Sequence, residues 1–280
     1  MSLDRSYLFV PGDRPERFDK ALASDAHAVI LDLEDAVIPE RKDQARAAMH
    51  TWLTTTPAKV WIRVNPTDTP WHVDDCALLA LPAVRGVMLP KAESPDGLRQ
   101  LASRLRQGQG LIPLVESVAG WFEALPLAQV SGVTRLAFGS FDFMSDSGIQ
   151  GDGEELDSVR TQLVLASRRA GLPAPIDGVS LAIDDNTQLE EDVRRSRRFG
   201  FGAKLCIHPR QVAGVHAAFA PTVAQIEWAK KVIAALASGP LGAIAVDGKL
   251  VDKPIALLAE SILAEATLAA LSVSPPAQSQ

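Results

Sequence analysis

Two carboxylates, Glu116 and Asp142, each follow a short apolar segment and could together bind a hard divalent cation. Mg²⁺ prefers oxygen ligands, commonly one or two carboxylates completed by water and substrate oxygens. If the two segments are neighbouring strands of one sheet, these side chains lie side by side, and we expect them to be metal ligands. Two unrelated solvated loop acids would produce the same pattern, so their positions alone leave both interpretations open.

Arg63 ends another apolar segment, directly after Trp61 and Ile62. A guanidinium at that place can hold a substrate carboxylate through two parallel hydrogen bonds. The alternative is a salt bridge to Glu34 or Asp35, and both interactions can exist together. Glu34 and Asp35 follow a further apolar segment, where they could hydrogen-bond water around a metal ion or satisfy free amides at a helix start.

Arg14 and Lys91 could attract the phosphate groups of a ligand. A charged helix face explains Arg14 equally well. His208 precedes a proline, and we interpret it as structural. Cys206 lies inside an apolar segment, which predicts a core position.

These polar residues depend on eight short runs rich in Val, Ile, Leu and Phe, each followed by a helical stretch. The runs lack polar alternation, which is typical of strands buried on both faces of a parallel sheet. Their starts lie roughly 20–40 residues apart, the length of a βα unit. Seven of the eight ends carry charged or titratable residues, at the edge where parallel folds place catalytic groups. The predicted strands are Ser6–Val10, Ala28–Leu33, Val60–Val64, Gly86–Leu89, Leu111–Val115, Arg135–Phe138, Ile176–Leu181 and Ala203–Ile207.

Eight such units favour an α/β fold, a (β/α)₈ TIM barrel with a C-terminal helical extension. An open doubly wound sheet is the alternative, because a count of strands does not show closure. We expect the barrel over residues 1–235 and the extension over 236–271, with a hairpin near Val246–Val251. Residues 272–280 are small, polar and proline-containing, which predicts a disordered tail.

Composition excludes several classes of partner. The 280 residues contain 28 Lys and Arg against 34 Asp and Glu, a net charge of −6, so we expect no nucleic-acid surface. No apolar run approaches the ~18–20 residues of a membrane span, and the N-terminus lacks a signal-peptide layout. Two cysteines, Cys76 and Cys206, fit neither a disulfide framework nor a zinc site. We therefore expect a cytoplasmic protein without a membrane partner.

Seven motifs, in this order along the chain, resemble the citrate lyase β-subunit family. That family includes malyl-CoA and citramalyl-CoA lyases, among the pyruvate/phosphoenolpyruvate-type TIM barrels. The resemblance covers about Arg5–Glu265. The occurrence of all seven motifs in the same order is specific to the family, whereas any one motif alone would be weak evidence. The motifs are Tyr7–Phe18, Ile30–Val37, Ile62–Asn65, Met88–Glu93, Leu114–Ser117, Phe138–Asp142 and Cys206–Pro209.

The resemblance implies a role for each candidate residue. Glu116 and Asp142 would be the Mg²⁺ ligands, with Glu116 also facing the substrate. Arg63 would be a catalytic residue that binds the carboxylate of a 2-oxo acid. Arg14 and Lys91 would help to hold coenzyme A.

The C-terminal extension also carries a family motif, Leu250–Pro254, which makes Asp252 the candidate acid/base residue. Without the resemblance, Asp252 would be an ordinary turn or helix-cap residue. In relatives this segment packs over the barrel of a neighbouring subunit, which implies a homotrimer or a multiple of trimers. Phe141 departs from the family, where many members have an acid immediately before the metal-binding Asp, so a citrate-specific activity is not implied.

The function implied is Mg²⁺-dependent cleavage or formation of a carbon–carbon bond in a 3-hydroxyacyl-CoA thioester, with a 2-oxo acid and an acyl-CoA as the other partners. Three alternatives stay open at this point. They are a CoA-free 2-oxo acid aldolase, an acyl-CoA thioesterase, and a subunit of a larger lyase complex that acts on a carrier-bound thioester.

Overall fold

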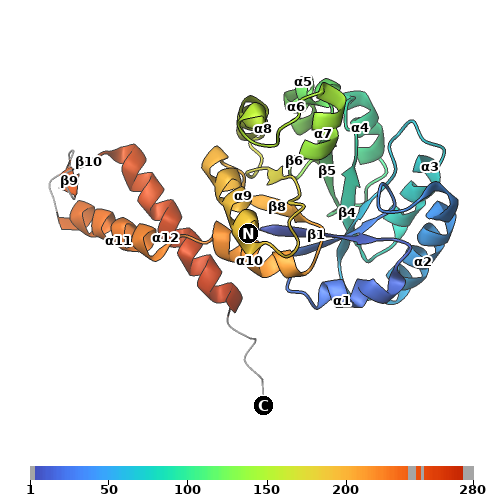
Figure 1. The fold of residues 1–280 in the computed structure, drawn as a ribbon, viewed down its shortest axis with the longest axis horizontal. Coiled ribbons are helices and arrows are strands. Elements are labelled where there is room, and N and C mark those ends of the chain that lie inside the picture. The colour runs from blue at the N-terminus through green and yellow to red at the C-terminus, as the bar shows by residue number, and fades with distance from the viewer. Residues whose placement is uncertain (1–3, 239–243, 247–248, 274–280) are drawn as a thin grey trace, which may run out of the picture. The chain divides into compact units, whose positions relative to one another are not determined.

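The computed structural model describes residues 4–238, 244–246 and 249–273. The chain divides into two compact units, one over Leu3–His216 and one that contains Ala217–Gln280. The first unit holds the barrel and the second holds the last long helices (Figure 1).

Eight parallel strands form a closed barrel in which each strand pairs with the next and β8 pairs with β1. This closure confirms the (β/α)₈ barrel and rules out the open sheet. All eight predicted strands are present. They are β1 (Ser6–Pro11), β2 (Ala28–Asp32), β3 (Val60–Arg63), β4 (Val84–Leu89), β5 (Gly110–Val115), β6 (Ala137–Phe138), β7 (Ile176–Asp177) and β8 (Ala203–Cys206).

The seventh strand is shorter than predicted, since it ends at Asp177 and not at Leu181. Beyond Asp177 the chain leaves the ladder, and the carbonyl of Ser180 accepts a hydrogen bond from Gln211 Nε2 at 2.8 Å. The apolar character of this segment reflects contact with the barrel mouth and not strand pairing. Val179 packs against the barrel core from there.

Helices surround the strands of the barrel (Figure 1). None among the described residues is both long and apolar enough to cross a bilayer. The barrel unit has α1 (Phe18–Leu22), α2 (Lys42–Thr55), α3 (His72–Asp75), α4 (Pro95–Ala102), α5 (Val118–Phe122), α6 (Ala124–Ala128), α7 (Ser140–Ser147), α8 (Asp157–Arg169) and α9 (Asn186–Phe199), and α10 (Arg210–Phe219) spans the boundary. Short 3₁₀ turns occupy Pro15–Arg17, Pro39–Arg41, Cys76–Ala80 and Glu154–Leu156.

Local sequence sets the helix ends. The Ser94 side chain accepts a hydrogen bond from the Gly97 amide at 3.1 Å and begins α4. Asp185 caps α9 in the same way, and Gly200 ends that helix in the left-handed conformation with φ of 97°. A short polar side chain before a helix and a glycine after it satisfy backbone groups that the helix itself leaves free.

The barrel interior is filled by side chains of alternate strand residues. Ile30, Trp61, Leu114 and Leu205 belong to this buried cluster. Gly86 leaves room for the Trp61 ring. A Cβ at position 86 would lie 2.4 Å from that ring, so a larger residue would not fit there. Since side chains alternate across a strand, residues two positions further along also point inward, at the carboxyl end of the barrel.

The C-terminal unit is a pair of helices joined by a hairpin. Helices α11 (Val223–Ser238) and α12 (Lys253–Val273) lie side by side, and β9 (Ile244–Val246) pairs antiparallel with β10 (Lys249–Val251) (Figure 1). This is the hairpin predicted from the sequence. We expected the barrel to extend to residue 235, whereas the division falls after His216 because α11 packs against α12. Helix α12 continues to Val273, and residues 274–280 of the predicted tail lie outside the described residues.

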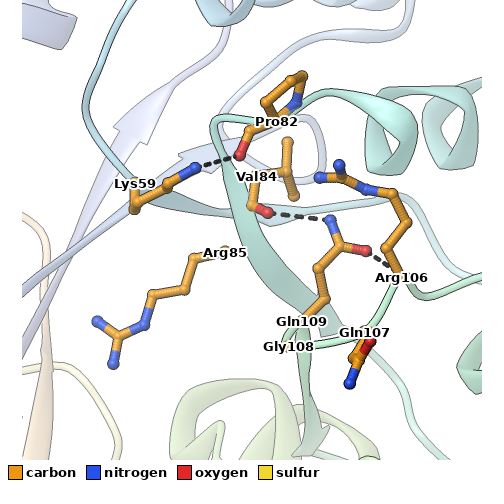
Figure 2. Close-up of a pocket in the computed structure, with 8 residues that line it drawn as sticks. All are labelled: Lys59, Pro82, Val84, Arg85, Arg106, Gln107, Gly108 and Gln109. Atoms are coloured by element: carbon orange, nitrogen blue, oxygen red, sulfur yellow. Dashed lines mark hydrogen bonds between the residues drawn. The ribbon is translucent and has the colours of Figure 1, made fainter.

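Polar side chains fix the turn that leads into β4 at the amino-terminal end of the barrel (Figure 2). Lys59 Nζ donates to the carbonyl of Pro82 at 2.7 Å. Gln109 Nε2 donates to the carbonyls of Val84 and Leu79, both at 2.9 Å, and its Oε1 accepts from the Arg106 amide. These contacts are structural, because they satisfy backbone groups at the end of the barrel opposite to the polar strand ends.

Replacing Gln109 with alanine is expected to lower the free energy of unfolding by about 1–3 kcal/mol, because carbonyl and amide groups lose their partner. Urea unfolding of the Gln109→Ala protein measures this loss. Gln107→Ala is the matched control, since Gln107 is exposed on the same turn. Equal stability of the two variants would contradict the role given to Gln109.

Candidate active site

The polar residues at the carboxyl end of the barrel line a cavity of about 250 Å³. Asp32 and Arg63 are the last residues of β2 and β3, where they pair in register. They lie two residues beyond Ile30 and Trp61, and so they continue the inward-facing rows of the core. Glu116 follows β5, and Asp142 lies in the first turn of α7, after β6. The fold therefore brings Arg63, Glu116 and Asp142 to one cavity, as predicted.

Arg63 is held in a fixed orientation by two acids. Its Nε and Nη2 donate to the two carboxylate oxygens of Asp32 at 2.7 and 2.6 Å, and its Nη1 lies 3.0 Å from Glu34 Oε2. The Phe9 ring lies 4.5 Å from the guanidinium. Burial opposes the charge of Arg63, but Asp32 and Glu34 outweigh it and raise the pKa. The side chain is thus a permanent cation, and its terminal nitrogens still have N–H groups to offer a ligand.

Asp32 is the functional residue that sequence reasoning missed. The sequence left open a salt bridge from Arg63 to Glu34 or Asp35, and the structure pairs Arg63 with Glu34 and, more closely, with Asp32. Asp35 is exposed on the cavity rim, and its amide donates to Glu34 Oε2 at 3.0 Å. The available signal was that two consecutive predicted strands carry residues of opposite charge one position before their predicted ends.

Backbone groups on both sides position Glu116. Its Oε1 accepts a hydrogen bond from the Lys91 amide at 2.8 Å. Lys91 has a φ of 46°, in the left-handed region that non-glycine residues rarely adopt, and this conformation presents the amide to Glu116. On the other side, a Cβ at Gly139 would lie 2.5 Å from Glu116 Oε2, so glycine is required there. Lys91 Nζ also lies 4.0 Å from Glu34 Oε1.

Negative charge exceeds positive charge around the cavity. Burial raises the pKa of Glu116 to about 8, and the neighbouring Asp142 and Glu34 add to this effect. Burial likewise raises the pKa of Glu34 to about 7, and burial followed by Asp35 raises that of Asp142. The cations that interact with these acids are Arg63, Lys91 and Lys42. The acids of this part of the barrel are Asp32, Glu34, Asp35, Glu116 and Asp142.

This charge balance fits a divalent cation held by Glu116 and Asp142. Both side chains offer carboxylate oxygens to the same cavity, and the charge of Asp142 raises the preference of Glu116 for a proton or a positive ion. Among the described residues, no group of three or more His, Cys, Asp or Glu side chains is placed to hold a metal ion. Two carboxylates are sufficient for Mg²⁺, which usually keeps several water molecules.

The remaining predicted residues lie elsewhere. Arg14 is exposed after β1, with its Nε 3.8 Å from Asp13 Oδ1, and it is not one of the residues described as lining the cavity. Asp252 is exposed in the C-terminal unit, where its Oδ1 accepts a hydrogen bond from the Ile255 amide at 3.2 Å and caps α12. Cys206 is fully buried, as predicted for a core residue.

Ser140 is a second residue that the sequence did not single out. It is buried and lines the cavity, and its Oγ has no hydrogen-bond partner among the described residues. A hydroxyl in this position can donate to or accept from a bound ligand. Its only sequence signal was its place between Gly139 and Asp142.

Asp32→Asn is expected to lower the free energy of unfolding by about 3 kcal/mol or more, because it removes the main counter-charge of a buried cation. Chemical denaturation measures the change. Asp35→Asn is the matched control, since Asp35 lines the same cavity from an exposed position. A loss for Asp32→Asn no larger than that for Asp35→Asn would show that Arg63 does not depend on this pair.

Glu116 predicts a pH dependence of stability in the metal-free protein. The folded state keeps its proton to about pH 8, while the ordinary pKa of 4.5 applies to the unfolded chain. The folded protein binds more protons between these values, so its stability falls as pH rises across that window. Glu116→Gln cannot ionise. In EDTA we expect this variant to be more stable than the unsubstituted protein at about pH 8, with the difference shrinking towards about pH 5.

Urea unfolding across this pH range tests the effect. Glu93→Gln is the control, because Glu93 is an exposed acid that follows β4, the strand next to β5 in the barrel. Parallel pH profiles for all three proteins would refute a protonated, buried Glu116.

Comparison with known proteins identifies the family of this chain. Residues 5–209 match the HpcH/HpaI aldolase/citrate lyase family. A citrate lyase subunit beta-like protein of Mycobacterium tuberculosis is 37% identical over 267 residues, which cover 93% of this chain and 94% of the relative. A (3S)-malyl-CoA thioesterase of Cereibacter sphaeroides is 31% identical and covers 94% of each chain.

Solved structures similar to this chain include proteins of the same kind. The crystal structure of CitE from M. tuberculosis in complex with magnesium, acetoacetate and coenzyme A matches with a TM-score of 0.84 and 33% identity, over 95% of this chain and 99% of that one. RipC from Yersinia pestis matches with a TM-score of 0.69 and 32% identity, over 79% of this chain and 97% of that one. The chain therefore belongs to the HpcH/HpaI aldolase/citrate lyase family and is an enzyme of the carbon–carbon lyase class.

Proposed function

We propose that this enzyme is a Mg²⁺-dependent lyase that cleaves a 3-hydroxyacyl-CoA thioester to a 2-oxo acid and an acyl-CoA, or catalyses the reverse condensation. The observation that carries the proposal is the cavity shared by an oriented cation, Arg63, and two carboxylates, Glu116 and Asp142. Related structures with magnesium and pyruvate and with magnesium and oxaloacetate support the 2-oxo acid, and the CitE structure with magnesium, acetoacetate and coenzyme A supports the coenzyme.

Each residue of the cavity has a distinct task. Arg63 binds the carboxylate next to the reacting carbon and fixes its orientation, because Asp32 and Glu34 prevent the guanidinium from rotating. Glu116 and Asp142 would hold Mg²⁺, which supplies positive charge where the substrate oxygen becomes more negative. Lys91 keeps Glu116 in place through its amide.

Cleavage then requires two proton transfers. The substrate hydroxyl loses its proton, the electrons of that O–H bond form the carbonyl of the 2-oxo acid, and the carbon–carbon bond breaks. The electron pair of the broken bond passes to the thioester enolate, which must take up a proton. We assign that proton transfer to Asp252, which would remove the same proton in the condensation direction.

The rest of the assignment concerns the coenzyme and the assembly. Arg14 and Lys91 are partly or fully exposed cations on loops after β1 and β4, and we propose that they contact the phosphates of coenzyme A. The Leu250–Pro254 segment would act in the site of a neighbouring subunit, and we propose the homotrimer or multiple of trimers that the family resemblance implies.

Thioester hydrolysis is the second candidate, because several relatives about one-third identical to this chain are named (3S)-malyl-CoA thioesterases. In that reaction water attacks the acyl carbon, and free coenzyme A is released with the hydroxy acid intact. Product analysis separates the candidates, since only the lyase yields a 2-oxo acid.

Purified protein with Mg²⁺ is expected to release a 2-oxo acid from at least one of malyl-, citramalyl- and citryl-CoA. Glu116→Gln and Asp142→Asn should each lower turnover at least about 100-fold. Each removes a ligand of the Mg²⁺ ion whose positive charge would stabilise the reacting oxygen. Asp252→Asn should lower turnover without changing Mg²⁺ affinity. Chromatography of the products and titration with Mg²⁺ measure these effects.

Glu93→Gln again serves as the control and should retain full turnover. Full activity of Glu116→Gln and Asp142→Asn at saturating Mg²⁺ would overturn the metal assignment. Release of coenzyme A without any 2-oxo acid would replace the lyase with the thioesterase, and activity on the free hydroxy acid alone would indicate a CoA-free aldolase. Cleavage only of a carrier-bound thioester would indicate a subunit of a larger complex.

A further inference from the structure

The wall of the active-site cavity has a polar side and an apolar side, and the order of the strands separates them. The charged lining residues lie in β2 and β3 or in the segments that follow β2, β5 and β6. The strands β7, β8 and β1 are consecutive neighbours in the barrel, and the cavity residues in and after them are apolar. These are Phe9, Pro11, Val179, Leu205 and Ile207.

Phe141 adds a further apolar side chain from the first turn of α7. It lines the cavity directly before Asp142, and α7 follows β6, the strand that neighbours β7 in the barrel. Leu205 is 3% exposed, whereas Ile207 is 38% exposed at the mouth. The apolar side therefore runs from the barrel core to the rim.

The proposed reaction places the substrate across this division. The carbonyl carbon of a 2-oxo acid carries three groups: a carboxylate, an oxygen and one further substituent. Arg63 binds the carboxylate, and the oxygen points towards Glu116 and Asp142. The third substituent is left to face the apolar side.

The charge of the cavity argues against a second carboxylate in that substituent. Arg63, the one cation among the described lining residues, is already paired with Asp32 and Glu34. A carboxymethyl group would bring a second negative charge near several other acids. The described lining residues offer it no second cation, and the Ser140 hydroxyl offers it only a neutral donor. Burial of an unpaired charge is strongly unfavourable, whereas burial of a methyl or ethyl group is favourable.

We propose that Phe141, Val179, Leu205 and Ile207 determine the specificity of the enzyme for the 2-oxo acid. They select an acid whose carbonyl carbon carries a short alkyl group over one that carries hydrogen or a carboxymethyl group. This inference rests on the proposed function, because it takes the binding of the carboxylate to Arg63 from it.

Four 2-oxo acids with different substituents test the selection with the Mg²⁺-loaded full-length enzyme. They are glyoxylate with hydrogen, pyruvate with methyl, 2-oxobutanoate with ethyl and oxaloacetate with carboxymethyl. Calorimetry measures the Kd of each acid, and condensation with acetyl-CoA, followed by chromatography, measures kcat/KM. We expect pyruvate or 2-oxobutanoate to exceed glyoxylate by about tenfold and oxaloacetate by about 100-fold.

Ile207→Ala tests the wall itself. The substitution shortens a partly exposed side chain at the mouth, which favours folding of the variant. It should shift the preference towards the branched acid 3-methyl-2-oxobutanoate by about tenfold relative to pyruvate. Leu181→Ala is the matched control, because Leu181 is an exposed aliphatic residue after β7 that is not described as lining the cavity, and it should leave the order of substrates unchanged.

The outcomes separate this inference from the proposed function. A preference for glyoxylate or oxaloacetate, or equal use of all four acids, overturns the inference while lyase activity stands. Binding in the expected order without carbon–carbon bond formation or cleavage supports the wall and overturns the lyase. Failure of all four acids to bind overturns both. A variant Ile207→Ala with the original order of substrates also overturns the role of the wall.

Discussion

Arg63 can remain charged inside the barrel because Asp32 meets it in register at the end of the adjacent strand. A buried guanidinium without such a partner would lose far more solvation than it regains. The two-point contact also sets its angle, and Glu34 and the Phe9 ring restrict it further. An anionic ligand must align with this fixed cation. Arg63 therefore determines how such a ligand meets the other groups of the cavity.

Backbone conformation has a comparable role around Glu116. The left-handed Lys91 and the side-chain-free Gly139 enclose this carboxylate from two sides, so the acid cannot move away from its charged neighbours. Burial is the main cause of the raised pKa of Glu116, and the charges of Asp142 and Glu34 add to it. Contacts that have a structural role alone lie at the opposite end, such as those of Gln109 with backbone carbonyls (Figure 2). At the carboxyl end, the pair of Asp32 and Arg63 serves both stability and the site.

The sequence predicted the eight strands, their order and the meeting of Arg63, Glu116 and Asp142 in one cavity. These predictions succeeded because apolar runs and strand ends are local patterns that a parallel barrel uses in a regular way. Closure of the barrel, the pairing of Asp32 with Arg63 and the short seventh strand depend on register, which no local pattern shows. No local pattern shows that Ser140 lies in the cavity either. The roles of Arg14 and Asp252 came from family resemblance, and they stay predictions because the structure gives each an exposed, locally bonded position.

The barrel is joined unevenly around its circumference. Between β6 and β7 the ladder consists of one residue pair, Ala137 and Ile176, whereas β1 and β2 share five. Phe141, in the first turn of α7, and Val179, on the segment after β7, follow the two strands of this lightly bonded seam. Because so few backbone hydrogen bonds join these strands, substitution of either side chain disturbs little of the remaining ladder. Natural variation in the 2-oxo acid that the enzyme accepts can therefore arise at Phe141 and Val179 without movement of Asp32 or Arg63.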